Sequence, residues 1–105
     1  MQDIEMIAAL SNAFGPSGFE DDAVAVARSY APEGYTLEED SLRNLYIRRA
    51  EEDAYKPVVM LDAHSDEVGF MVQTIRPDGT LKFIPLGGWT PSNIPAHLQV
   101  WCSYA

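Results

Sequence analysis

An unbroken apolar run at residues 58–61 is followed at once by a polar loop that contains His64 and Asp66. Apolar residues without alternation are typical of a strand that is covered on both faces, so residues 58–63 are predicted to form a central strand. Ligands of open α/β sheets bind beyond the carboxyl ends of the strands, where this loop would lie.

Two helices are predicted ahead of this strand. Residues 3–14 place apolar side chains at spacings of three, three and four, which is one stripe of a helix. The Gly15-Pro16 pair should end this helix, because Gly tolerates a left-handed cap and Pro restricts the residue before it. Residues 17–20, Ser-Gly-Phe-Glu, are typical of a capping box and would begin a second helix that runs to about Tyr30.

Short β segments follow, in pairs joined by turns. The turn at residues 77–79, Pro-Asp-Gly, is favourable because Pro presets one dihedral angle and Gly accepts a positive φ. The predicted strands are 35–39 with 44–49, 68–75 with 81–86, and a further strand that begins at Leu98. The sequence thus predicts an α/β fold in which two N-terminal helices lie on a mixed β-sheet, with a module boundary near Gln73.

Composition narrows the class of protein. The 105 residues are 47% hydrophobic, which is typical of one globular domain at most, and the net charge of −9 disfavours nucleic acid and membrane surfaces as partners. The single cysteine, Cys102, cannot form an internal disulfide. No basic signal region or membrane-length apolar run is present, so a cytoplasmic protein is expected.

His64 and Asp66 are the candidate site. Neutral imidazole is a good zinc ligand, and a carboxylate that accepts its other ring N–H fixes the tautomer. The structural alternative, in which His64 caps a strand end and Asp66 is a solvated carboxylate, is more common on spacing alone. His97 is a weaker candidate for a second metal ligand, since a polar strand or loop residue explains it better. Cys102 has no evident base partner, so a strand residue is expected there rather than a nucleophile. Trp89 would either line a substrate groove or anchor a loop on a strand.

Three segments, taken in order, resemble the glutamyl aminopeptidase and tetrahedral aminopeptidase family of di-zinc metallopeptidases. Residues 57–72 are similar to the family's strand and metal loop, and residues 10–20 to its opening helix and Gly-Pro-Ser-Gly-x-Glu turn. Residues 75–89 resemble the segment after the metal loop. The resemblance covers the chain to about Val100.

The resemblance implies specific roles. The family's first zinc-ligand histidine falls on His64, and the aspartate that orients it falls on Asp66, while Glu67 is given no catalytic role. In the complete enzyme two zinc ions activate a water for removal of N-terminal residues from peptides. The second histidine, the glutamate base and the other carboxylate ligands lie beyond residue 105. Residues 1–72 would be the start of the catalytic domain, and residues 73–105 the beginning of an inserted β-rich dimerisation domain.

Two departures from the family pattern lie near these motifs. Ser65 stands where the family often has Met. Arg43 stands before Asn44 where the family usually has Gly, and a residue with a Cβ resists a positive φ at such a turn. The tail at residues 101–105 does not resemble the family's continuing strand.

Three functional hypotheses follow. The first is an N-terminal fragment of a cytoplasmic zinc aminopeptidase, inactive by itself. The second is a stand-alone binding or oligomerising module, a homo-oligomer such as a strand-swapped dimer, because unpaired strand edges recruit other chains. A glycanase is a weaker third, since adjacent carboxylates such as Glu38 and Glu39 point to opposite faces of a strand and do not converge.

Overall fold

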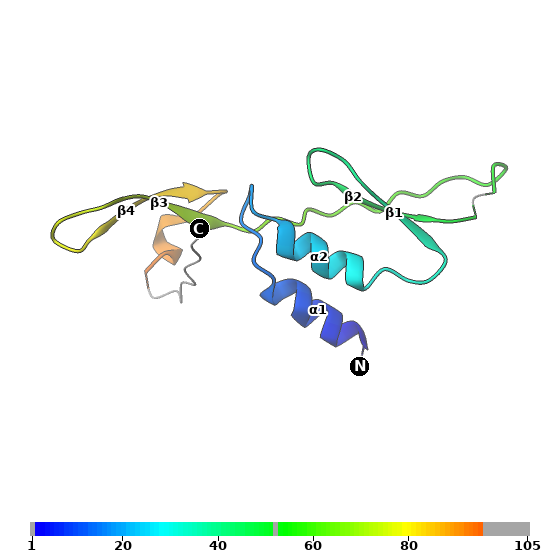
Figure 1. Ribbon diagram of the computed structural model, residues 1–105, viewed down its shortest axis with the longest axis horizontal. Coiled ribbons are helices and arrows are strands. Elements are labelled where there is room, and N and C mark those ends of the chain that lie inside the picture. Colours follow the sequence, from blue (N-terminus) through cyan, green and yellow to red (C-terminus); the bar gives the residue numbers. More distant parts are fainter. Residues whose placement is uncertain (1, 52, 96–105) are drawn as a thin grey trace. The chain divides into compact units, whose positions relative to one another are not determined.

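The computed structural model describes residues 2–51 and 53–95, in two compact units that divide between Glu67 and Val68. Figure 1 shows the elements along the chain. The first unit holds two helices and one strand pair: α1 (Gln2–Asn12), α2 (Asp21–Ser29), β1 (Tyr35–Glu39) and β2 (Leu45–Arg49). The second holds another strand pair and a 3-10 turn: β3 (Gly69–Ile75), β4 (Leu81–Leu86) and η1 (Pro91–Asn93). The predicted class, α and β elements with two helices followed by antiparallel strand pairs, is confirmed.

The two helices lie side by side in the first unit (Figure 1). The second does not begin with the predicted capping box. Its N-cap is Glu20, whose side chain makes no cap bond and instead accepts a hydrogen bond from the Gly18 amide at 2.6 Å. Asp21 and Asp22 occupy the first turn, where the helix dipole favours negative charge.

The first hairpin has the predicted pairing. β1 and β2 are antiparallel, with Tyr35 opposite Arg49 and Glu39 opposite Leu45. Asp40 organises the turn, because its Oδ1 accepts the amides of Leu42 at 2.9 Å and Asn44 at 3.0 Å. The carboxylate of Asp40 thus accepts amide hydrogen bonds that a backbone carbonyl would accept in an ordinary turn.

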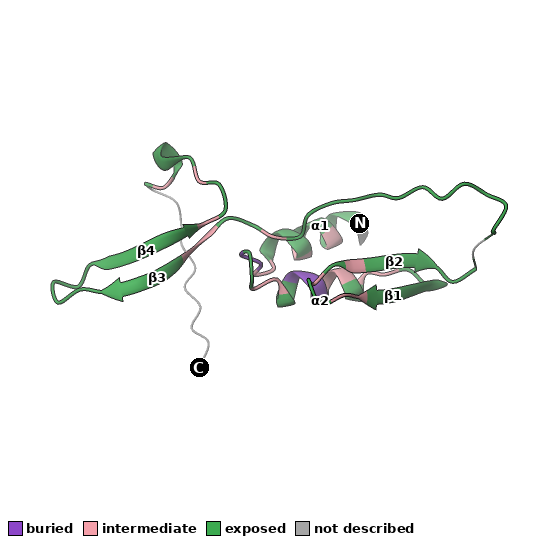
Figure 2. Cartoon of the chain, turned by 90° about the horizontal axis from the view of Figure 1, so that it is seen from above, coloured by how far each residue is buried: buried purple, intermediate pink, exposed green. Residues whose placement is uncertain are grey.

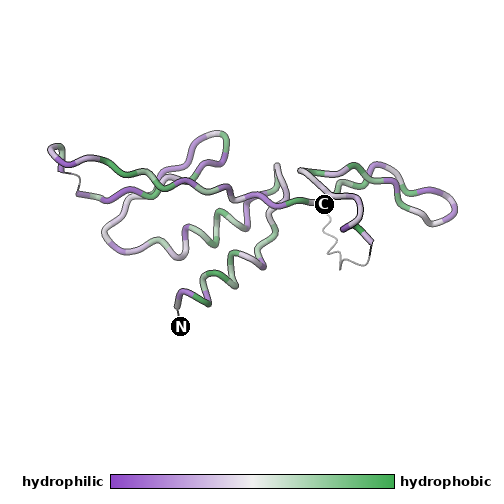
Figure 3. The backbone as a smooth tube through the Cα atoms, turned by 180° about the vertical axis from the view of Figure 1, so that it is seen from behind, coloured by the Kyte–Doolittle hydropathy of each residue, from purple (hydrophilic) through white to green (hydrophobic). Residues whose placement is uncertain are grey.

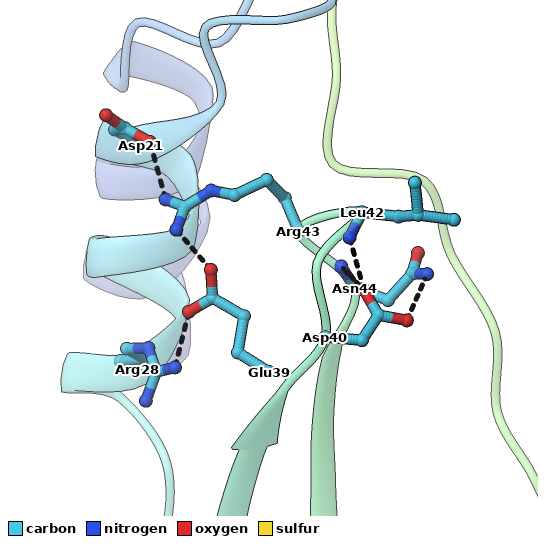
Figure 4. Close-up of polar contacts among 7 residues, drawn as sticks. All are labelled: Asp21, Arg28, Glu39, Asp40, Leu42, Arg43 and Asn44. Carbon is cyan, nitrogen blue, oxygen red and sulfur yellow. Dashed lines mark hydrogen bonds and ion pairs between the residues drawn. The ribbon is translucent and has the colours of Figure 1, made fainter.

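Arg43 adopts a positive φ of 67°, although it stands where a glycine would be easier to accommodate. Its guanidinium pairs with Asp21 at 2.6 Å and with Glu39, which also pairs with Arg28 at 2.5 Å (Figure 4). The amide of Arg43 donates to the carbonyl of Asp40 and closes the turn. These contacts offset the steric cost of the left-handed backbone, so the turn forms without glycine.

The second unit is a hairpin with an aromatic cluster. β3 and β4 are antiparallel, with a bulge between Val72 and Thr74. Their turn closes as predicted, with the Arg76 amide donating to the Thr80 carbonyl at 2.9 Å and Gly79 at a φ of 82°.

The aromatic cluster of this unit is built on Phe70. The ring of Trp89 stacks on Phe70, with centroids 4.5 Å apart, and Phe83 meets Phe70 edge-on at 4.5 Å. The indole N–H of Trp89 donates to the Gly69 carbonyl at 2.9 Å. Trp89 is thus the loop anchor that one of the two interpretations predicted.

The prediction of a central strand at residues 58–63 is wrong. These residues have no regular secondary structure, and the side chains of Val58 and Leu61 are 86% and 94% exposed. Among the described residues, each of the two sheets consists of one antiparallel strand pair, and residues 58–63 contribute to neither pair. The physical reason is that a strand is defined by hydrogen bonds to neighbours, and no described segment pairs with this one.

Burial is concentrated at one point. Within the described ranges, the buried residues are Ala23 and Val24 of α2, at 6% and 3% exposure, together with Gly15 and Pro16 of the turn before it (Figure 2). The apolar stripe predicted for α1 is present, yet Ile4 and Ile7 are exposed; Figure 3 shows hydrophobic positions along this helix.

None of the helices in the described part of the chain has both the length and the apolar character that a membrane crossing requires. His97, Cys102 and the strand predicted from Leu98 lie outside the described residues.

Candidate functional site

The candidate site is the loop of residues 62–66, at the end of the first unit. Its side chains are those that the sequence analysis selected, His64 and Asp66. The loop follows the exposed segment 58–61 and leads into Glu67, which forms an isolated parallel β-bridge with Pro16.

His64 and Asp66 contact each other directly. Nδ1 of His64 lies 3.1 Å from Oδ1 of Asp66 and 2.9 Å from the Asp66 backbone carbonyl oxygen. An ionised carboxylate and a carbonyl can only accept hydrogen bonds, so this geometry requires Nδ1 to carry the proton. In the neutral ring, Nε2 then has the lone pair that a metal would use.

This pair is accessible from solvent. The side chain of His64 is 85% exposed and that of Asp66 is 41% exposed. An accessible imidazole with one nitrogen held by a carboxylate is a donor that suits zinc. Among residues 2–51 and 53–95, however, no three His, Cys, Asp or Glu side chains are grouped to hold a metal ion. A metal at His64 would therefore need further ligands from elsewhere.

Glu67, for which no catalytic role is expected from the sequence, ties the loop to the segment between α1 and α2. Its amide donates to the Gly15 carbonyl at 2.8 Å, and the Gly15 amide donates to its Oε1 at 3.1 Å. The two residues are 52 positions apart, so no local periodicity could reveal this contact.

Of the other carboxylates, Glu39 and Asp40 belong to the first hairpin rather than to the loop. The hydrogen bond from Arg28, together with the nearby charge of Arg43, lowers the pKa of Glu39 below its usual value. The side-chain amide of Asn44 is the main cause of the lowered pKa of Asp40. Both carboxylates are engaged in holding the turn, which gives them a structural part in this unit.

Known proteins of similar sequence indicate the family of this chain. The family model of M42 glutamyl aminopeptidase matches residues 44–100, more than half of the chain. The chain is 38% identical over 92 residues to a glutamyl aminopeptidase of Lactococcus lactis subsp. cremoris, covering 87% of this chain and 26% of the relative. It is 33% identical over 102 residues to a lysyl aminopeptidase of Pyrococcus furiosus, covering 92% of this chain and 28% of the relative.

The chain thus spans little more than a quarter of the length of these curated relatives. No solved structure matches it significantly. The matched region includes the loop with His64 and Asp66, and the family match extends over both compact units. The chain therefore belongs to the M42 glutamyl aminopeptidase family.

Proposed function

We propose that this chain is the N-terminal part of a zinc-dependent aminopeptidase, which removes N-terminal residues from peptides in the cytoplasm. The observation that carries the proposal is the family match across residues 44–100. Two relatives of similar sequence, a glutamyl and a lysyl aminopeptidase, agree with it. The contact between His64 and Asp66 supports it from the structure.

In this proposal His64 is a zinc ligand through Nε2, and Asp66 is the residue that orients it. Bound zinc supplies Lewis acidity for water and for the peptide carbonyl. The contribution of this chain is to hold the proton of the ring at Nδ1, which presents the Nε2 lone pair outward and raises its basicity.

The chain alone is proposed to be inactive. Hydrolysis needs further metal ligands and a general base, and the described residues group no such set around His64. Residues 1–72 are proposed as the start of the catalytic domain, and residues 73–105 as the beginning of an inserted dimerisation domain.

A hybrid enzyme tests the proposal. The chain replaces the matching segment of the Lactococcus lactis glutamyl aminopeptidase, and the release of N-terminal residues from peptides is followed by mass spectrometry. We expect activity in the hybrid, loss of activity and of zinc in His64→Ala, and retention of both in the neighbouring control Ser65→Ala. A folded hybrid that is active without His64, or peptide cleavage by the isolated chain, would contradict the proposal.

A second candidate is an oligomerising module without catalysis. It is favoured by the exposed apolar side chains of residues 58–61, and by two-stranded sheets whose outer edges pair with no other described strand. Size-exclusion chromatography with light scattering distinguishes the two. Dimers that dissociate when Val59 and Leu61 are replaced by Lys would support the module, whereas a monomer at all concentrations would exclude it.

A further inference from the structure

The loop with His64 is anchored at one end by a reciprocal pair of hydrogen bonds. The Glu67 amide donates to the Gly15 carbonyl at 2.8 Å, and the Gly15 amide donates to the Glu67 carboxylate at 3.1 Å. Glu67 thus provides a hydrogen-bond partner for both the amide and the carbonyl of Gly15. Gly15 and Pro16 are buried, and a buried amide without a partner is costly, so the carboxylate has a defined structural task.

The anchor point is also closely packed. A Cβ added to Gly15 would lie 3.3 Å from Cβ of Ala23 and 3.4 Å from the carbonyl oxygen of Ser65. Gly15 therefore sits between the buried face of α2 and the backbone of the loop itself. The loop residue next to His64 packs against the turn that follows α1.

The opposite end of the loop has no comparable support. The preceding segment, residues 58–63, is exposed and without regular structure. Among the hydrogen bonds of the described residues, those that tie residues 62–67 to the segment between α1 and α2 are the two between Glu67 and Gly15. The bonds of His64 stay within the loop, to Asp66.

Asp66 and Glu67 are adjacent in the chain, yet one contacts His64 and the other contacts Gly15. In extended backbone, successive side chains point to opposite sides. Asp66 reaches the ring of His64, and the next residue, Glu67, reaches the Gly15 amide. Because Asp66 and Glu67 are joined by one peptide unit, the bond between Glu67 and Gly15 restrains the position of the Asp66 carboxylate.

We propose that Glu67 is a positioning residue, which docks the loop on the Gly15-Pro16 turn and thereby holds Asp66 against Nδ1 of His64. This inference rests on the proposed function only for its consequence, the affinity of His64 for zinc. The tautomer of His64 is a separate consequence that needs no metal.

The test compares Glu67→Ala with Glu67→Gln, which keeps an oxygen acceptor for the Gly15 amide. Glu33→Ala is a control with the same change in charge at an exposed position. Ring nitrogen chemical shifts of His64 report its tautomer above neutral pH in the chain itself. Zinc added alone to the hybrid enzyme, which supplies the further ligands, gives the zinc dissociation constant.

We expect Glu67→Ala to lower the fraction of His64 that is protonated at Nδ1 and to raise the zinc dissociation constant about fivefold. That is less than the roughly 10–100-fold typical of losing the group bonded to the ligand itself. Glu67→Gln and Glu33→Ala should resemble the unchanged chain, with the Gly15 amide protected from hydrogen exchange.

The outcomes separate the two proposals. A Gly15 amide without protection, or a tautomer unchanged in Glu67→Ala, would overturn the positioning role. A shifted tautomer with no zinc bound at His64 in any variant would support the positioning role and contradict the metal role of His64. If Glu67→Ala does not fold, Glu67→Asp gives the same readout, because it withdraws the carboxylate by one methylene and retains the charge.

Discussion

Nδ1 of His64 lies 3.1 Å from Oδ1 of Asp66 and 2.9 Å from the carbonyl oxygen of the same residue. Two acceptors around one ring nitrogen leave a single arrangement for the proton of a neutral imidazole. The side chain and the backbone of Asp66 thus select the same tautomer, which leaves the lone pair of the neutral ring on Nε2.

Replacing Asp66 tests how much the side chain adds to the backbone. Asp66→Ala keeps the carbonyl acceptor and loses the carboxylate, so we expect zinc affinity to fall about tenfold. Asp66→Asn retains an oxygen that can accept from Nδ1 and should lose less. Zinc titration of the hybrid enzyme, followed by the His64 ring signals, measures both, and equal affinities in the unchanged hybrid and the two variants would show that the carboxylate contributes nothing.

Arg43 allows backbone strain and ion pairing to be separated. Arg43→Ala retains a Cβ at a φ of 67° and loses the pairs with Asp21 and Glu39, so the first hairpin should be destabilised. Arg43→Gly loses the same pairs but relieves the strain. We expect the Gly variant to be more stable than the Ala variant by about 1 kcal/mol, measured by denaturant unfolding. Identical stabilities would mean that the turn changes conformation when the guanidinium is removed.

The first hairpin should weaken in acid. The Arg28 hydrogen bond lowers the pKa of Glu39, and the Asn44 side chain lowers that of Asp40. A carboxyl with a lower pKa in the folded state stabilises the fold above its unfolded pKa, and this stability is lost as the pH falls through the folded pKa.

We therefore expect the amide chemical shifts of β1 and β2 to lose their dispersion as the pH falls below about 4. Asp40→Asn should lose dispersion less steeply over that interval, since one titrating group is gone. Shifts that stay constant down to a pH of about 2 would contradict the expectation.

Trp89 should hold the second hairpin together. Trp89→Ala removes the stack on Phe70 and the bond to the Gly69 carbonyl, so we expect a loss of about 2 kcal/mol from the two terms. Trp89→Phe keeps a stacking ring and should lose about 1 kcal/mol, the share of the hydrogen bond. Hydrogen exchange of the β3 and β4 amides gives both values, and unchanged exchange in Trp89→Ala would show that the loop is not anchored there.

The sequence alone determined the elements that depend on near neighbours. Helical spacing placed α1, and turn residues such as Asp40 and Gly79 placed both hairpins, because the groups that stabilise these elements lie a few positions apart. The pairing of His64 with Asp66 was accessible for the same reason. The resemblance of residues 57–72 to a family of metallopeptidases added the hypothesis that His64 is a zinc ligand.

Only the tertiary structure decided the rest. It left residues 58–63 outside any sheet, because an apolar run becomes a strand only when neighbours satisfy its backbone. It placed Arg43 between Asp21 and Glu39, so a turn that favours glycine accepts an arginine. It also joined Glu67 to Gly15 across 52 residues. Each of these outcomes depends on groups far apart in the chain, which local sequence patterns do not connect.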